Sequence, residues 1–141
     1  AKKFNQDISR WNVSNVRGMD KMFASATAFN QNINNWNVGN VTNFKGMFLY
    51  TTSYNQPMDN WDVSKATSFM DMFTYASLFN QDLSKWNTMS ATSPTGMDNM
   101  FHATPMKQDL SKWCVPKINY APSNFGNTTG KNPVWKTCPA R

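Results

Sequence analysis

The stretch Phe79-Asn80-Gln81-Asp82-Leu83-Ser84-Lys85-Trp86 recurs along the chain and decides its fold. Versions of it begin at Phe4, Phe29, Tyr54 and Met106, and each of them ends in a tryptophan. These five tryptophans stand at positions 11, 36, 61, 86 and 113, so that three intervals are 25 residues and the last is 27. A period of this length is typical of repeat proteins whose units stack on one another and bury a continuous core. We therefore expect a stack of coils, one for each copy.

The second copy shows best how one coil is built. Its first part, Ile33-x-x-Trp36-x-Val38, ends in the alternation of a half-buried strand. Its later part, from Val41 to Phe48, has the three-residue spacing of a helix face. Residues that favour a helix N-cap stand just before this run in four copies: Gly18, Asn43, Ser68 and Gly96. The pattern predicts an α/β repeat solenoid of about five coils, with short parallel strands near each Trp-x-Val, short helical or 3₁₀ turns, and coils about 4.8 Å apart.

Stacking would place equivalent residues in columns. We interpret the tryptophan column as core rather than as a sugar-stacking platform, because it belongs to the apolar pattern, and the methionines as fillers of the helix face. A column of asparagines would run beside it. An amide both donates and accepts hydrogen bonds, so that a buried stack of amides can satisfy the backbone of the turns above and below. The asparagines in question are Asn5, Asn30, Asn55 and Asn80, each followed by a glutamine.

The phrase Phe-Asn-Gln-Asp-Ile-Ser-x-Trp-Asn-Val-Ser-Asn-Val at residues 4–16, with Met-x-x-Met-Phe-x-x-Ala at 19–26, resembles the repeat of the BspA-like leucine-rich-repeat surface proteins. That family also contains mycoplasma-type surface lipoproteins. The resemblance covers roughly residues 1–115 and implies a leucine-rich-repeat-like solenoid, secretion, cell-surface display, and adhesion through protein or matrix binding. It implies no catalytic site. The chain departs from the pattern at Thr88, which replaces the strand valine, and at Lys107, which replaces the ladder asparagine.

The chain holds two cysteines, Cys114 and Cys138, which bracket a segment rich in Pro, Gly and Asn. Two ligands with 23 residues between them and no histidine nearby do not make a zinc site. Given the resemblance to extracellular proteins, we predict a disulfide that closes a capping loop and contributes about 3 kcal/mol in the chain-entropy model. We therefore divide the chain into a repeat solenoid at 1–113 and a C-terminal cap at 114–141. The residues expected to cover the last coil are Val115, Phe125, Val134 and Trp135.

The formal charge of +6 is concentrated in the same segment. Residues 1–106 have a net charge of +1, whereas residues 107–141 have a net charge of +5. This basic end either keeps the molecule soluble and prevents end-to-end stacking, or faces anionic glycans, a phospholipid surface or an acidic partner. Nucleic acid is disfavoured, because the aromatic residues are periodic and not interleaved with the lysines. The candidate basic patch comprises Lys107, Lys117, Lys131, Lys136 and Arg141.

The sequence offers little for catalysis. The single histidine, His102, shares its place in the repeat with Ala24, Leu49 and Thr74, so that a general base is not expected there. No paired carboxylates and no phosphate loop recur, and we expect no enzyme activity, cofactor or metal. No stretch of 18 apolar residues is present to span a membrane. Three sequons begin at Asn12, Asn40 and Asn127, of which we expect Asn127 to be the most accessible.

The leading hypothesis is a non-enzymatic extracellular or cell-surface recognition module that binds proteins or glycans through the strand face. A structural building block of a larger surface assembly is the alternative, and ice binding by repeated Asn and Thr ranks is a weaker third idea. Because Ala1 stands in mid-repeat, we also expect a fragment of a longer chain, or an N-terminal end docked to a partner. The outward positions of the strand face are Arg10, Asn12, Asn35, Asn37, Asn60, Asp62, Lys85, Asn87 and Lys112.

Overall fold

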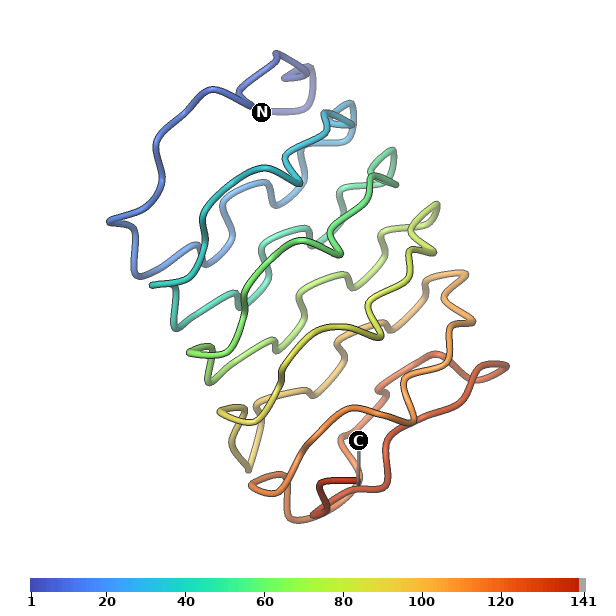
Figure 1. Ribbon diagram of the computed structural model, residues 1–141. Helices are drawn as coiled ribbons and strands as arrows, with labels where there is room; N and C mark the ends of the chain where they lie inside the picture. Colours follow the sequence, from blue (N-terminus) through green and yellow to red (C-terminus); the bar gives the residue numbers. More distant parts are fainter. Residues whose placement is uncertain (140–141) are drawn as a thin grey trace.

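The computed structural model describes residues 1–139 as one stack of coils that follow each other from the N-terminal to the C-terminal end (Figure 1). Each circuit of the chain occupies one sequence period. We number the coils from the first residue of each copy. Coil 1 is residues 4–28, coil 2 is 29–53, coil 3 is 54–78, coil 4 is 79–105, and coil 5 starts at 106.

The prediction of an α/β solenoid is wrong. Residues 1–139 contain no helix and no extended strand, and the chain runs through turns joined by irregular segments. The parallel strands expected near each Trp-x-Val are absent from this range. Within residues 1–139, strand-type pairing between the coils is limited to isolated parallel bridges, such as Gly18 with Asn43 and Asn43 with Ser68. These bridges lie at the positions that the pattern predicted as helix caps.

Two left-handed residues in each of coils 1–4 exclude the predicted helical turn. In coil 2 these are Gly46 at φ 63° and Tyr50 at φ 57°, whereas a right-handed helix needs negative φ throughout. Each of them lies inside a tight turn: the N–H of Met47 donates to the Phe44 carbonyl, and that of Thr51 to the Phe48 carbonyl. A series of such turns repeats the three-residue spacing of a helix face, which explains why the apolar pattern suggested a helix.

The N–H groups that a helix would use internally bind the next coil instead. Alternate residues of coil 2 donate to coil 3, with Gly46 N–H reaching the Met70 carbonyl and Phe48 N–H the Met72 carbonyl, both at 2.8 Å. The same alternation links coil 1 to coil 2 and coil 3 to coil 4. These bonds satisfy backbone groups that a buried segment without regular secondary structure would otherwise leave unpaired.

The tryptophan column is confirmed as core from Trp36 to Trp113, with side chains at most 3% exposed. The rings stack, for example Trp61 on Trp86 at 6.4 Å between centroids. Each indole N–H also donates to a backbone carbonyl of the preceding coil, as from Trp61 to Ile33 at 3.0 Å. Trp11 differs, because it lies at the first coil and is 54% exposed.

The amide column is also observed, although on an exposed edge rather than buried. The Asn5 side-chain oxygen accepts from the Asn30 backbone N–H at 2.9 Å and from the Gln31 amide at 2.9 Å. The same two contacts recur at Asn30, Asn55 and Asn80. At the departure Lys107, the backbone N–H still donates to Asn80, so that losing the asparagine there leaves the preceding step of the ladder intact.

The coil register continues past Trp113. Ile118 N–H donates to the Val115 carbonyl as in earlier coils, and Phe101 N–H donates to the Phe125 carbonyl at 2.8 Å. The predicted disulfide between Cys114 and Cys138 is present. The predicted covering residues Val115 and Phe125 are buried and Trp135 packs partly against the core, but the prediction for Val134 is wrong, because that side chain is 66% exposed.

Replacing Trp61 with alanine should lower the free energy of unfolding by about 3–5 kcal/mol, because the substitution opens a cavity and leaves the Ile33 carbonyl without its indole donor. Urea unfolding at neutral pH measures this change. Trp11→Ala is the matched control at the exposed end of the same column. Equal costs for the two variants would contradict the core role of Trp61.

Replacing Tyr54 with phenylalanine should stabilise the protein by about 1 kcal/mol. The hydroxyl is buried and has no hydrogen-bond partner among the described residues, and burial raises its pKa. Phenylalanine already occupies this place in coils 1, 2 and 4. A loss of stability in the same urea measurement would show that the hydroxyl has a partner, such as a bound water.

Candidate functional site

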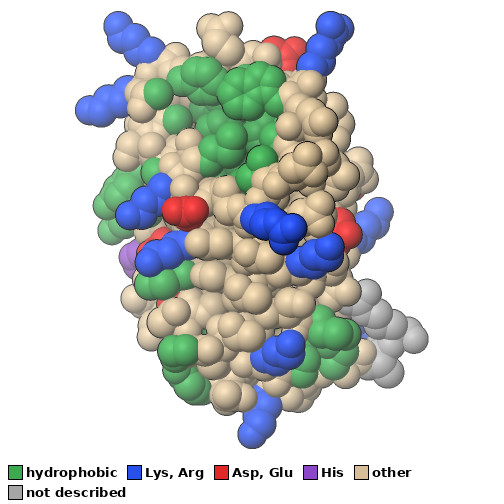
Figure 2. Space-filling model, turned by 90° about the vertical axis from the view of Figure 1, so that its left-hand side faces the viewer, with side chains coloured by type: hydrophobic (Ala, Val, Ile, Leu, Met, Phe, Trp, Pro, Cys, Tyr) green, Lys and Arg blue, Asp and Glu red, His purple; other side chains and the backbone are tan. Residues whose placement is uncertain are grey.

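The predicted binding positions belong to turns that line one edge of the stack. This turn edge, made of residues 7–15 and their equivalents in the later coils, lies on the left in Figure 1 and faces the viewer in Figure 2. The face in Figure 2 is mostly neither hydrophobic nor charged, with scattered Lys, Arg and Asp side chains. Hydrophobic side chains gather towards its N-terminal end.

Asparagine and aspartate side chains hold these turns in place. The Asn37 side-chain oxygen accepts from Gly39 N–H at 3.1 Å, and the Asp62 carboxylate from Ser64 N–H at 3.0 Å. Asn12 and Asn87 do the same for Ser14 and Met89. Four of the predicted binding residues therefore have a structural task, which leaves only part of each side chain free for a ligand.

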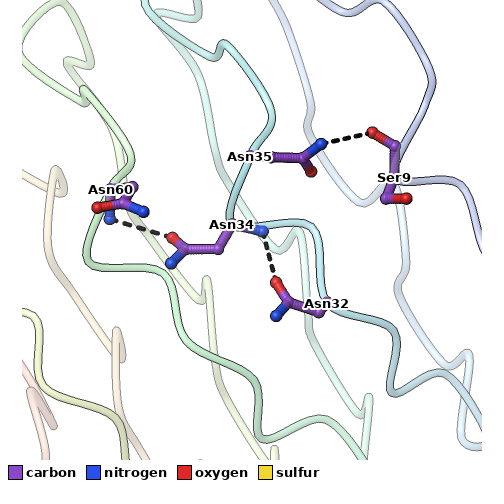
Figure 3. A pocket seen from close by; sticks show the side chains of 5 residues that line it. All are labelled: Ser9, Asn32, Asn34, Asn35 and Asn60. Atoms are coloured by element: carbon purple, nitrogen blue, oxygen red, sulfur yellow. Dashed lines mark hydrogen bonds between the residues drawn. The ribbon is translucent and has the colours of Figure 1, made fainter.

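The other five predicted positions form a second exposed rank: Arg10, Asn35, Asn60, Lys85 and Lys112. Asn35 donates from its amide nitrogen to the Ser9 carbonyl at 3.0 Å, which ties coil 2 to coil 1. No residue among 1–139 is hydrogen-bonded to the Asn60 side chain. The backbone N–H of Asn60 donates to the Asn34 side-chain oxygen at 3.0 Å. Figure 3 shows these groups around a common space.

Two shallow hollows lie along the turn edge, at equivalent places in different coils. The first, of about 470 Å³, spans coils 1–3, and the second, of about 290 Å³, spans coils 4 and 5. The sequence identified Asn35, Asn60 and Lys112 as candidates here, but not the neighbouring rank of Asn32, Asp82 and Asp109. The first hollow is lined by Ser9, Asn32, Asn34, Asn35 and Asn60, and the second by Asp82, Ser84, Gln108, Asp109 and Lys112.

Charge on the turn edge follows a rule that distinguishes the hollows. Coils 1, 4 and 5 carry an aspartate and, three residues later, a cation, as in Asp82 with Lys85. Hydrogen bonds from Ser84 lower the pKa of Asp82, and the Lys85 charge lowers it further. The pKa values of Asp7, beside Arg10, and Asp109, beside Lys112, move in the same direction, again mainly through hydrogen bonds from a following serine. Coils 2 and 3 have no charge at these two positions.

The candidate basic patch is dispersed over the C-terminal coil. Lys107, Lys117, Lys131 and Lys136 are all exposed, and Arg141 lies outside the described residues. Lys131 and Lys112 both lower the pKa of the Asp109 carboxyl after the hydrogen bonds from Ser111. Part of the positive charge is therefore balanced locally.

The expectation that Asn127 is the most accessible sequon is wrong. Its side chain is 2% exposed, and the amide binds both the N–H and the carbonyl of Gln108, at 2.8 and 3.0 Å. Asn40 is half-buried and binds the Ser14 carbonyl. Asn12 is exposed, with its side-chain oxygen used by the turn.

Other reactive groups lie apart from the turn edge. His102 packs edge-on against Tyr75, with 5.5 Å between ring centroids. Within residues 1–139, no three His, Cys, Asp or Glu side chains are grouped so that they could hold a metal ion. In the same range, no helix has the length and apolar character needed to cross a membrane.

Stacked coils of one sequence period, with a hydrogen-bonded turn edge, define this molecule as a repeat protein. The chain matches the family described as "Mycoplasma protein of unknown function, DUF285" over residues 1–86 and 40–136, and it belongs to that family. No curated protein and no solved structure matches it.

The aspartates of the turn edge predict a loss of stability in acid. Hydrogen bonds lower the pKa values of Asp7, Asp62, Asp82 and Asp109 below their ordinary 3.8. A carboxyl whose folded pKa is depressed stabilises the fold above its unfolded pKa, and this contribution is lost as pH falls through the folded value. The free energy of unfolding should therefore be level above about pH 5 and decline below about pH 4.

Urea midpoints between pH 2 and pH 7 test this dependence. Asp82→Asn is the informative variant, because asparagine caps the equivalent turn in coil 2 and does not titrate. It should decline less steeply in acid than the natural protein. An identical acid profile for the two proteins would exclude the Asp82 cap as a contributor.

Proposed function

We propose that this protein is a non-enzymatic recognition or adhesion module that binds proteins or glycans outside the cell through its turn edge. The observation that carries the proposal is the first hollow, where exposed amides of adjacent coils are held on a fixed backbone. Asn34 links two coils there, since its side chain accepts from Asn60 N–H and donates to the Asp59 carboxylate at 3.0 Å. Binding groups on a rigid scaffold lose less entropy when a ligand arrives.

Display outside the cell is supported by the disulfide. Bonds of this kind form and persist mainly in oxidising compartments, and Cys114–Cys138 is the pair that joins the C-terminal segment to coil 5. The repeat also resembles that of the BspA-like surface proteins in sequence. We propose kinship with those proteins at the level of the repeat motif, without their helical and strand geometry.

A structural building block of a surface assembly is the second candidate. It is favoured by the first coil, where Trp11 is 54% and Met22 38% exposed while their equivalents in coils 2–4 are buried. Figure 2 shows hydrophobic side chains gathered towards this end. Exposed apolar groups of this kind mark interaction sites in many proteins.

A binding screen with a matched pair of variants tests the leading proposal. The oxidised protein is immobilised and offered extracellular-matrix proteins and a glycan array. Asn60→Arg on the turn edge should weaken any ligand found by about tenfold or more, through lost contacts and a bulky charge. Leu78→Arg, at an exposed position in a turn outside this edge, should leave the affinity unchanged.

The reverse outcome, with Leu78→Arg weakening the ligand and Asn60→Arg having no effect, would place recognition elsewhere. Absence of any ligand together with concentration-dependent association in sedimentation would favour the assembly candidate. Trp11→Ser should then abolish the association, because it removes the largest exposed apolar side chain of coil 1.

A further inference from the structure

The first hollow presents amide atoms that the fold does not use. The Asn32 side-chain oxygen accepts a hydrogen bond from Asn34 N–H at 2.9 Å, and no described residue binds the Asn32 amide nitrogen. The Asn35 amide nitrogen donates to the Ser9 carbonyl, and the Asn35 side-chain oxygen has no partner among the described residues. The Asn60 side chain has neither atom bound within residues 1–139. The hollow therefore offers both free donors and free acceptors, on the lining residues labelled in Figure 3.

The electrostatic surroundings of the first hollow select against anionic ligands. None of the five lining residues carries a charge, whereas the second hollow is lined by Asp82, Asp109 and Lys112. Two carboxylates are hydrogen-bonded to lining residues: Asp7 accepts from the Ser9 backbone N–H at 2.9 Å, and Asp59 accepts from the Asn34 amide at 3.0 Å. A carboxylate at this place repels an anionic ligand and accepts hydrogen bonds from a neutral one.

The lining also lacks what a protein partner would need as an anchor. Interface hot spots are dominated by tryptophan, tyrosine and arginine that fill apolar pockets, and the hollow is lined by four asparagines and a serine. A hydroxyl group can donate one hydrogen bond while it accepts another. A side-chain amide does the same, donating from its nitrogen and accepting at its oxygen. Adjacent hydroxyls on a rigid ring would match adjacent amides on a rigid edge.

We propose that the hollow over coils 1–3 is a subsite for a neutral saccharide that presents adjacent hydroxyl groups. This inference rests on the proposed function and names its ligand class. The Asn32 nitrogen donates to a sugar oxygen, the Asn35 oxygen accepts from a hydroxyl, and the Asn60 amide does both. Because the hollow is shallow and open to water, one subsite binds weakly, with Kd of the order of millimolar, and a polysaccharide gains by repeated contacts.

The test uses two variants that leave the turns intact. Asn32→Asp keeps the cap, since aspartate performs it at the same place in coils 1, 4 and 5, but it replaces the free donor with a carboxylate. Asn60→Leu removes an amide that binds nothing in the described fold. Asn119→Leu is the matched control, because it makes the same substitution at an exposed asparagine outside the turn edge. Urea midpoints confirm that all three are folded.

The probe is a glycan array of neutral mannose, glucose, galactose and N-acetylhexosamine oligomers, beside sialylated and sulfated ones. We expect binding to at least one neutral series, reduced about tenfold or more by Asn32→Asp and by Asn60→Leu and unchanged in Asn119→Leu. Binding to the anionic series alone, or to no glycan, overturns the inference. If no neutral glycan binds but a matrix protein does, and Asn60→Arg weakens it, the proposed function stands while the saccharide subsite fails. If neither glycan nor protein binds, both fail.

Discussion

The hydrogen bonds from alternate N–H groups of one coil to the carbonyls of the next are the constraint on which this structure depends. Residues 1–139 contain no helix and no extended strand, but the polar backbone groups buried in their core must still be paired. Here the left-handed residues, such as Tyr50 at φ 57° and Tyr75 at φ 59°, turn the backbone so that neighbouring N–H groups point along the stack. Once the coils are joined in this way, equivalent side chains must lie over one another. The aromatic columns and the amide ladder follow from that register.

Side chains make the hydrogen bonds between coils in the segments where the backbone makes none. Between residues 33 and 40, the contacts with coil 1 are made by the Trp36 indole and by the amides of Asn35 and Asn40, each donating to a carbonyl of coil 1. This division of work explains a composition rich in asparagine and tryptophan. It also explains why the Asn35 oxygen is open to a ligand, since this side chain binds coil 1 through its nitrogen alone. Structural support and candidate recognition are therefore combined in one side chain at Asn35.

Several features could be read from the sequence because they depend only on the period. The tryptophan core, the Asn ladder and the coil count follow from copies placed one above another. The Cys114–Cys138 bond came instead from the resemblance to extracellular proteins. Helices and strands could not be predicted correctly, because a series of turns gives the same three-residue spacing as a helix. Glycine at a position of positive φ would distinguish a turn from a helix, but the sequence gives this signal weakly. Of the equivalent left-handed positions in coils 1–3, coil 2 has Gly46, whereas coils 1 and 3 have Lys21 and Asp71.

The candidate site was predictable only in part. Its outward rank could be located, because residues between buried positions must face water, and Asn35 and Asn60 were identified in that way. The hollow itself depends on two neighbouring coils and on which side-chain atoms remain unpaired after packing. Asn32 and Asn34 belong to it for that reason, although each taken alone has the composition of an ordinary turn. The burial of Asn127 had no signal in the sequence, since it results from contacts with Gln108, which lies 19 residues away along the chain.

Scalar couplings across hydrogen bonds, measured by nuclear magnetic resonance on isotope-labelled protein, test the central claim most directly. They identify which carbonyl each N–H group binds. The structure predicts a coupling from Phe48 N to the carbonyl carbon of Met72, and from Gly46 N to that of Met70. A coupling from Phe48 N to the carbonyl carbon of Phe44 would instead reveal a helical turn within the coil, and would contradict a stack held together by hydrogen bonds between coils.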